Sequence, residues 1–370
     1  MSGKSRLGWR LLYCLGLLIF LEVVARFSLT LITKTWEPVV PPEVGAFDPS
    51  LGWKLKPGAC ATSKRTGREV EYCINDKGLR GKELAYEKKP GVFRIVLLGD
   101  SRTFGFGVPV EQHFSTVVKD YFRRLEVVNL GIDGYGIDQE LLLLQDEGFK
   151  YAPDLVLVYV PHFHNFRHMR TKVWGMGKPR FKLAGGKLEV ENSPVTNTGQ
   201  AFAALRSVDQ TLSRWWKTYK IFRDTILFVA DEDGPIRKFF QGNKEDTDIE
   251  TPEFQQEAQQ LAEAILEAMN AACKARNAKL VLLTAIERLY KAALEQSIPA
   301  LNVTTCLDNV AFRLPDRLAH FNEAGNGALA WDISTFLTAN DLIPAGHLRK
   351  KNEFSYPEKK PEQDAAPQHP

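Results

Sequence analysis

Ser101 is the residue in this sequence whose position best suits a nucleophile. It follows residues 93–98, an apolar run that predicts a buried strand, and Gly99-Asp100-Ser101 lead from this strand into a predicted helix. A side chain placed there lies at the carboxyl edge of a parallel sheet, where the N–H groups of the helix start can face an oxyanion. A serine needs a neighbouring base to attack a carbonyl carbon, and the tripeptide alone equally fits a helix cap.

A histidine with a nearby carboxylate precedes the last predicted helix. His320 follows Asp316 by four residues, and Asn322 is the predicted N-cap of a helix that runs to about residue 337. An imidazole held by a carboxylate can take the proton of a serine hydroxyl. Asp308 is a second candidate for the carboxylate that orients His320.

Alternating strands and helices connect these residues. Strands are predicted near 93–98, 127–130, 155–160 and 280–284, and apolar residues recur at helical spacing over 114–125 and 254–272, with another helix from Asp138. This order predicts an α/β layered fold with a mostly parallel sheet. Open sheets of this kind bind ligands at the carboxyl ends of their strands, which is where Ser101 is expected.

Three sequence blocks resemble those of the SGNH, or GDSL, hydrolase family. Residues 96–105 resemble its first block, residues 129–136 its second with Gly134 as the best match, and residues 316–325 its last. The resemblance spans residues 91–342 and implies a three-layer flavodoxin-like sandwich over 91–345. It also implies an esterase that needs no cofactor, with Ser101 as nucleophile, His320 as base and Asp316 as the carboxylate that orients it.

The chain departs from the family pattern at two places. The family Asp usually stands three residues before the His, whereas Asp316 stands four before His320. The third block usually reads Gly-x-Asn-Asp, whereas residues 161–167 read Pro-His-Phe-His-Asn-Phe-Arg. Either Asn165 or His164 takes the place of the family Asn, and Asn165 is favoured because an amide donates at every pH.

The predicted oxyanion donors are therefore the N–H groups of Ser101 and Gly134 and the amide of Asn165. The expected substrate is an ester, chiefly an O-acetyl group, on a cell-envelope or extracellular glycan or lipid. Transfer of the acyl group to a polysaccharide hydroxyl is an alternative that uses the same acyl-enzyme, with a membrane-bound acyltransferase as the partner that supplies the acyl group.

Two other classes of function are weighed against an enzyme. A glycan-binding module without catalysis would use Trp174, Trp215 and Trp216 as stacking surfaces. A zinc site would use three histidines that stand close together in the third block, His162, His164 and His168. No acidic or cysteine ligand stands near these histidines in the sequence, so no metal is expected.

The N-terminal segment predicts a location at the inner membrane. Residues 1–10 are basic, and the apolar stretch 11–33 is long enough to span a bilayer, with Glu22 and Arg26 spaced to pair on one helix face. Positive charge ahead of the span predicts a cytoplasmic N-terminus and a single-pass anchor, with the body in the periplasm or outside the cell. A cleaved signal peptide is the alternative.

The rest of the chain divides by composition. Residues 34–90 predict an extended, β-rich lead-in, residues 166–250 an insertion or lid with a hairpin around Gly185-Gly186, and residues 346–370 a disordered tail.

Lys and Arg total 48 against 45 Asp and Glu, a net charge of +3, which gives no reason to expect a nucleic-acid partner. Cys60 and Cys73 flank a turn and predict a disulfide across a hairpin, and the four cysteines of the body predict up to two disulfides.

Overall fold

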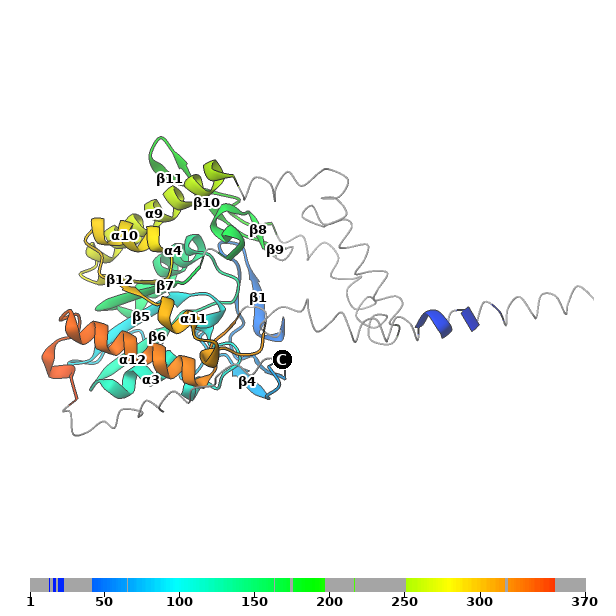
Figure 1. Cartoon of the computed structure of the whole chain (residues 1–370), viewed down its shortest axis with the longest axis horizontal. Coiled ribbons are helices and arrows are strands. Elements are labelled where there is room, and N and C mark those ends of the chain that lie inside the picture. Colours follow the sequence, from blue (N-terminus) through cyan, green and yellow to red (C-terminus); the bar gives the residue numbers. More distant parts are fainter. Residues whose placement is uncertain are drawn as a thin grey trace, which may run out of the picture.

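A sheet of five parallel strands forms the centre of this protein, whose structure is a computed structural model (Figure 1). The structure describes residues 13, 16, 17, 19–22, 42–64, 66–162, 164–173, 176–196, 216, 251–316 and 319–349. The strands lie in the order β13-β12-β7-β5-β6, with bounds β5 Phe93–Gly99, β6 Leu125–Asn129, β7 Leu155–Val160, β12 Lys279–Thr284 and β13 Ala300–Asn302. From β6 onward this is the 2-1-3-4-5 order of flavodoxin-like sheets.

Helices cover both faces of the sheet, which gives three layers (Figure 1). Successive strand residues point to opposite faces, so Val96 and Leu98 join one buried cluster while Ile95 and Leu97 join the other. The first cluster is closed by α4 (Ile137–Asp146), α9 (Pro252–Lys274) and α10 (Glu287–Glu295). The second is closed by α3 (Phe114–Val117), α11 (Thr304–Asp308) and α12 (Glu323–Ala339). The predicted α/β fold is therefore confirmed.

Local sequence signals explain where the two longest helices begin. The hydroxyl of Thr251 accepts from the N–H of Phe254 at 3.2 Å, and Pro252 occupies the first turn of α9, where its missing N–H costs nothing. The side chain of Asn322 accepts from the N–H of Gly325 at 2.9 Å, which confirms the predicted N-cap of α12.

Shorter elements differ from the sequence prediction. The predicted helix over 114–125 consists of α3 and the 3-10 helix η3 (Val118–Tyr121). It ends before residue 125 because β6 already begins at Leu125. Neither β13, which is three residues long, nor α10 was predicted. The other 3-10 helices are η1 (Pro42–Val44), η2 (Val110–Gln112), η4 (Gly148–Tyr151), η5 (His164–Met169), η6 (Val310–Phe312) and η7 (Ala345–His347).

Two hairpins form the lead-in and pack against the α/β core. They are β1 (Gly45–Asp48) with β2 (Gly52–Leu55), and β3 (Cys60–Ser63) with β4 (Val70–Cys73). The indole N–H of Trp53 on β2 donates to the carbonyl oxygen of Asp133 at 2.9 Å, and the amide of Gln139 on α4 donates to that of Leu51 at 2.8 Å. The lead-in thus supports the loop after β6, where the second sequence block lies.

One disulfide is present among the described residues. Cys60 and Cys73 are bonded across the β3–β4 hairpin, which confirms that prediction. The prediction of a second disulfide is wrong, because Cys273 lies buried in α9 and Cys306 lies buried in α11, and both are free thiols. They belong to the clusters on opposite faces of the sheet.

The segment after β7 contains the predicted hairpin. It consists of β10 (Arg180–Ala184) and β11 (Lys187–Glu191) around Gly185-Gly186, preceded by the short pair β8 (Lys172–Val173) and β9 (Met176–Gly177). The predicted lid role stays a prediction, since residues 197–215 and 217–250 lie outside the described part. Trp174 and Trp215 also lie outside it, and Trp216 is exposed.

The C-terminal boundary differs from the prediction. Residues 346–349, which were predicted to belong to the tail, pack on the core: Leu348 pairs with Phe122, and the N–H of Arg123 donates to the carbonyl oxygen of His347 at 2.7 Å. The predicted disordered tail beyond residue 349 lies outside the described residues.

Within the described residues, no helix combines the length and apolar character needed to cross a membrane. Most of the predicted anchor, residues 11–33, lies outside the described part. Its described residues are helical, and their large apolar side chains are exposed: Tyr13, Leu17, Ile19, Phe20 and Leu21.

Candidate active site

Ser101 lies where β5 turns into the four-residue helix α2 (Ser101–Phe104). The carboxylate of Asp100 caps this helix by accepting from the N–H of Arg102 at 3.0 Å. Gly99 has φ +153°, and a Cβ at this position would lie 2.1 Å from Oγ1 of Thr103, so only glycine lets α2 fold back against the strand. Ser101 is thereby held at the carboxyl edge of the sheet, beside β7, at the topological switch point of a 2-1-3-4-5 sheet.

The structure brings together the three residues that the sequence proposes as a triad. The Nε2 atom of His320 lies 2.8 Å from Oγ of Ser101, although 219 positions separate the two residues. On the other side of the ring, Nδ1 of His320 is hydrogen-bonded to Oδ2 of Asp316. Ser101 and His320 are 2 % and 1 % exposed, so this chain of hydrogen bonds is shielded from water.

The four-residue spacing between Asp316 and His320 is accommodated by the shape of their loop. The N–H of Leu314 donates to the carbonyl oxygen of His320 at 2.7 Å and closes the loop. Ala319 adopts φ +50°, and the N–H of His320 donates to Oδ1 of Asp316 at 3.0 Å. Both carboxylate oxygens therefore face His320. Asp308, the other candidate, is exposed and lies 3.7 Å from Arg313 instead.

The hydrogen bonds fix the protonation of the pair. Burial pushes the pKa of Asp316 upward, but the hydrogen bonds from the ring and N–H of His320 and the charge of Arg102 outweigh it, so the pKa lies below its ordinary value. Asp316 is then a carboxylate that can only accept. Nδ1 of His320 carries the proton, and Nε2 is left to accept from the hydroxyl of Ser101. This is the arrangement that a general base needs.

Two further contacts lie at His320 and at the residue before it, and neither was predicted from the sequence. The ring of Phe106 packs against that of His320 with 4.8 Å between centroids and 58° between planes. The guanidinium of Arg102 lies 3.5 Å from the carbonyl oxygen of Ala319, the residue before His320.

Two backbone amides at this site have no backbone acceptor in the described part of the chain. They are the N–H groups of Ser101, at the start of α2, and of Gly134, in the loop after β6. The carbonyl oxygen of Asp133 faces the indole of Trp53, and because C=O and N–H point in opposite directions in a trans peptide, the N–H of Gly134 points away from Trp53. The same loop approaches α2 closely, since a Cβ on Gly131 would lie 2.4 Å from the backbone nitrogen of Phe104.

The third sequence block forms η5, directly after β7. Its two candidate donors, His164 and Asn165, begin this helix, and their side chains lie outside the described part, so the choice between them stays a prediction. The ring of His168 is buried, with Nε2 3.0 Å from the carbonyl oxygen of Ala258, and it serves the packing of α9.

His162 lies beside the site, as expected if the histidines of the third block line the rim of the active site rather than bind a metal. It lies two residues after β7 and lines a small pocket together with Asp100 and Gly136. Burial and the charge of Arg102 lower the pKa of His162, so its ring is neutral at neutral pH. Among the described residues, no group of His, Cys, Asp and Glu side chains has the arrangement of a metal site.

Glu140 lines the same pocket with a buried carboxyl group. It is 3 % exposed, and its Oε2 atom has no hydrogen-bond partner in the described part of the chain. Burial, followed by the negative charges of Asp100 and Asp138, raises the pKa of Glu140 well above its ordinary value, and Arg167 offsets this only in part. Glu140 is therefore protonated in the folded protein at pH values where it is ionised in the unfolded chain.

The raised pKa predicts how a Glu140→Gln variant behaves. A carboxyl whose pKa is raised by folding stabilises the protein fully only below its unfolded pKa, and this contribution is lost as pH rises toward the folded pKa. Glutamine is neutral in both states, so we expect the variant to melt about 2–4 °C higher than the wild type at pH 8, with the difference disappearing near pH 4. Thermal unfolding followed by circular dichroism measures both. Glu267→Gln, on the exposed face of α9, is the control, and a lower melting temperature of Glu140→Gln at pH 8 would contradict the protonated state.

Comparison with known proteins gives matches to solved structures alone. No protein-family model matches the chain, and no curated protein matches it. The structure of TesA matches with a TM-score of 0.38 at 13 % identity, over 66 % of this chain and 98 % of TesA.

Two other matches are of similar strength. A member of the lipolytic protein G-D-S-L family from Veillonella parvula gives a TM-score of 0.34 at 12 % identity, over 67 % of this chain and 99 % of that protein. A catalytic mutant of Axe2, an acetylxylan esterase from Geobacillus stearothermophilus, gives 0.36 at 12 % identity, over 68 % and 96 %. Because the identities and TM-scores are this low, the functional proposal rests on the side chains of this chain.

Proposed function

We propose that this protein is a serine esterase that cleaves acyl esters through Ser101, His320 and Asp316. The observation that carries the proposal is the continuous set of hydrogen bonds from the carboxylate of Asp316 through His320 to Oγ of Ser101, 2.8 Å from Nε2. A partly buried carboxylate, an imidazole and a hydroxyl in this order form a nucleophile with its base already in contact.

The geometry supports a two-step reaction. Oγ of Ser101 bonds to the ester carbonyl carbon while Nε2 of His320 takes its proton, and the carbonyl electron pair moves onto oxygen. His320 then gives the proton to the departing alkoxide, which leaves an acyl group on Ser101. Water attacks this acyl group by the same steps in reverse, with Asp316 stabilising the imidazolium each time.

The oxyanion is proposed to bind three donors. The N–H groups of Ser101 and Gly134 lack backbone acceptors among the described residues, which fits amides kept for a ligand. Asn165 is proposed as the third donor. Losing one such donor typically costs about 3 kcal/mol of transition-state stabilisation.

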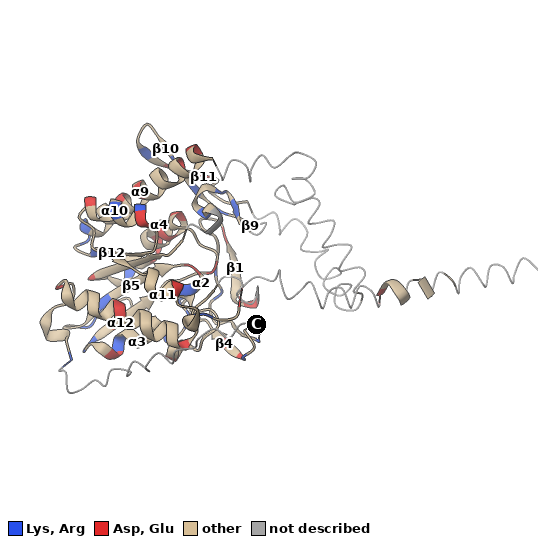
Figure 2. Cartoon of the chain, in the orientation of Figure 1, with Lys and Arg blue, Asp and Glu red and all other residues tan. Residues whose placement is uncertain are grey.

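The proposed substrate is an O-acetyl or other acyl ester on a glycan or lipid of the cell envelope or the space outside it. Figure 2 shows acidic and basic residues interspersed along the described helices and strands, which fits an uncharged reacting group better than a polyanion. The test is hydrolysis of p-nitrophenyl acetate and release of acetate from acetylated glycans by the full-length protein. Glycan binding without any turnover would instead support a non-catalytic module.

Acyl transfer is a second candidate, and the low exposure of the site favours it. Ser101 and His320 are 2 % and 1 % exposed, and restricted access of water lets a sugar hydroxyl compete for the acyl-enzyme. A membrane-bound acyltransferase is the partner proposed to supply the acyl group. Product analysis with and without an acceptor sugar separates the two reactions: acylated acceptor indicates transfer, and free acid alone indicates hydrolysis.

We propose that residues 11–33 anchor the protein in the inner membrane, with the site in the periplasm or outside the cell. The Cys60–Cys73 disulfide fits an oxidising compartment, and apolar side chains such as those of Ile19 and Phe20 are exposed along the described helical residues of the segment. Extraction of membranes at high pH should leave the protein in the pellet. Intact protein in the soluble fraction would contradict an anchor.

A further inference from the structure

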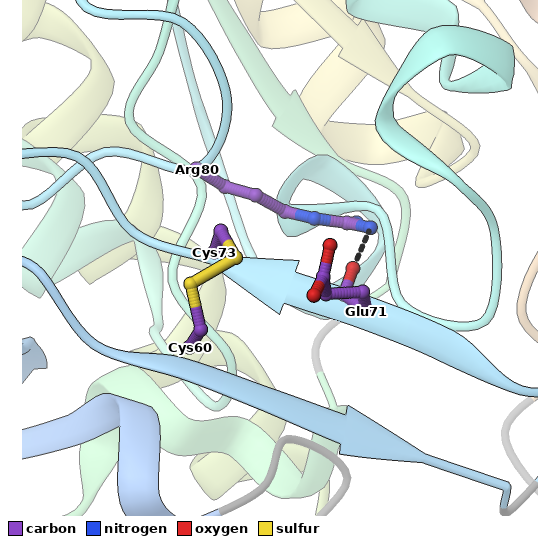
Figure 3. The surroundings of a disulfide bond; sticks show 4 residues. All are labelled: Cys60, Glu71, Cys73 and Arg80. Carbon is purple, nitrogen blue, oxygen red and sulfur yellow. Dashed lines mark hydrogen bonds between the residues drawn. A yellow bond between two sulfur atoms is a disulfide. The ribbon is translucent and has the colours of Figure 1, made fainter.

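A buried arginine connects the lead-in to the turn that follows α2. Arg80 is 7 % exposed, and its Nη1 group donates to the carbonyl oxygens of Phe104, at 3.1 Å, and Gly105. Its Nη2 group donates to the carbonyl oxygen of Val108 at 2.7 Å and to that of Glu71 on β4 at 3.3 Å (Figure 3). One side chain therefore holds three carbonyl groups of the turn and one of the hairpin.

The guanidinium suits this place better than another side chain would. Its donors form a planar fork that can reach several carbonyl oxygens at once, and its positive charge complements the carbonyl end of a helix. It also lies over the rings of Tyr72, at 4.5 Å, and Phe104, at 5.2 Å. Burial lowers the pKa of Arg80 to about 10, so the group keeps its charge at neutral pH.

The disulfide-bonded hairpin holds the same turn. Cys60 and Cys73 are opposite each other in the β3–β4 register, and their bond fixes the strand that carries Tyr72. The N–H of Gly107 donates to the hydroxyl of Tyr72 at 2.9 Å, and the Tyr72 ring lies nearly parallel to that of Phe106, with 6.3 Å between centroids. The hairpin thus contacts the turn through both a hydrogen bond and an aromatic stack.

The turn after α2, held by Arg80 and the hairpin, contacts both Ser101 and His320 of the proposed site. The N–H groups of Gly105 and Phe106 donate to the carbonyl oxygen of Ser101 at 3.1 and 3.0 Å. The ring of Phe106 packs on the imidazole of His320. A shift of the turn would therefore move the hydroxyl and its base relative to each other.

We propose that Arg80 is a positioning residue for the Ser101–His320 pair, and that the Cys60–Cys73 disulfide keeps it effective, so that reduction of this bond lowers turnover. The inference rests on the proposed esterase function. Cys60 is exposed and Cys73 partly exposed, so a dithiol in solution can reach them. Reduction converts the disulfide into two thiols while the dithiol closes into its own disulfide, which balances two electrons and two protons.

Arg80→Met and Arg80→Lys variants of the full-length protein test whether Arg80 positions the Ser101–His320 pair. We count functional sites by titration with a fluorophosphonate and measure kcat per titrated site on p-nitrophenyl acetate. Misplacement of a nucleophile from its base lowers kcat, so we expect Arg80→Met to lose about 10- to 100-fold, with KM within about 3-fold, and Arg80→Lys to regain part of it. Lys64→Gln, on the same hairpin but paired with Glu69 in solvent, is the matched control. Wild-type kcat per titrated site in Arg80→Met would overturn the proposal, because a purely structural role lowers only the number of sites.

Reduction of the wild type tests the role of the Cys60–Cys73 disulfide, and this test does not need an Arg80 variant that folds. We expect dithiothreitol, or the paired Cys60→Ser and Cys73→Ser substitutions, to lower kcat per titrated site and to speed hydrogen exchange at the amides of Gly105, Phe106 and Gly107. Reduced, folded protein with full turnover and unchanged exchange would refute the proposal. Absence of turnover in the untreated wild type would instead refute the esterase function, while the exchange measurement still decides whether the hairpin holds the turn.

Discussion

Replacing Ser101 with alanine is expected to lower kcat for p-nitrophenyl acetate by about 10⁵- to 10⁶-fold, because removing a triad nucleophile removes the covalent step altogether. The same variant should give no adduct with a fluorophosphonate probe, since Oγ is the atom that the probe would trap. The fold should survive, because the substitution removes one hydroxyl whose hydrogen bond at 2.8 Å joins it to His320. Ester turnover, intact-protein mass spectrometry after labelling and thermal unfolding measure the three effects.

Ser50→Ala is the matched control for this variant. Ser50 lies exposed in the turn between β1 and β2, where its backbone N–H, which alanine keeps, donates to Asp48. Wild-type turnover and labelling are expected there. Undiminished labelling of Ser101→Ala would mean that another nucleophile reacts, and it would remove Ser101 from the proposed mechanism.

The parts of the fold that the sequence predicted are those with a strong local signal. The long apolar repeat of α9 and the short buried runs of β5, β7 and β12 were placed within a few residues of their observed bounds. The strand β13 was missed because three residues carry too little pattern to distinguish a strand from a loop. The helix over 114–125 was predicted too long, because its apolar spacing continues through η3, where the backbone has already tightened into a 3-10 turn.

The site could be predicted only where residue type and order suffice. Ser101, Asp316 and His320 stand in recognisable blocks, and the structure brings them into hydrogen-bond contact. The supporting roles of Arg80 and Phe106 could not be predicted in the same way. Residues 78–81 resemble the lead-in of exported family members, but this resemblance gives Arg80 no role, and Phe106 lies in the turn after α2. Their contacts with the site depend on how distant segments pack.

The family resemblance favours Asp316 over Asp308, but residue spacing alone does not exclude Asp308, since both precede His320 at distances that a loop could close. Three backbone features decide the geometry: the bond from the N–H of Leu314 to His320, the left-handed conformation of Ala319, and the N–H of His320 that binds Oδ1. None of them has a signature in residue type, because alanine rarely adopts positive φ.

An Asp316→Asn variant is expected to lose about 10⁴-fold in kcat, with KM little changed. An amide can donate to Nδ1 of His320, which then gives up its proton to Nε2. In that tautomer Nε2 donates and no longer accepts from the hydroxyl of Ser101. The shape of the site is kept while its base is disabled. Steady-state kinetics on p-nitrophenyl acetate from pH 5 to pH 9 measure the loss.

Asp308→Asn is the matched comparison, because it makes the same chemical change eight positions away. The carboxylate of Asp308 is exposed and 3.7 Å from Arg313, and an exposed pair of this kind contributes little, so we expect kcat within about 2-fold of the wild type. A greater loss in Asp308→Asn than in Asp316→Asn would reverse the assignment. If only Asp316→Asn is impaired, then Asp316 orients the base from four residues before His320, one more than the usual spacing in the family. The left-handed conformation of Ala319 accounts for this, because it lets both carboxylate oxygens of Asp316 face His320.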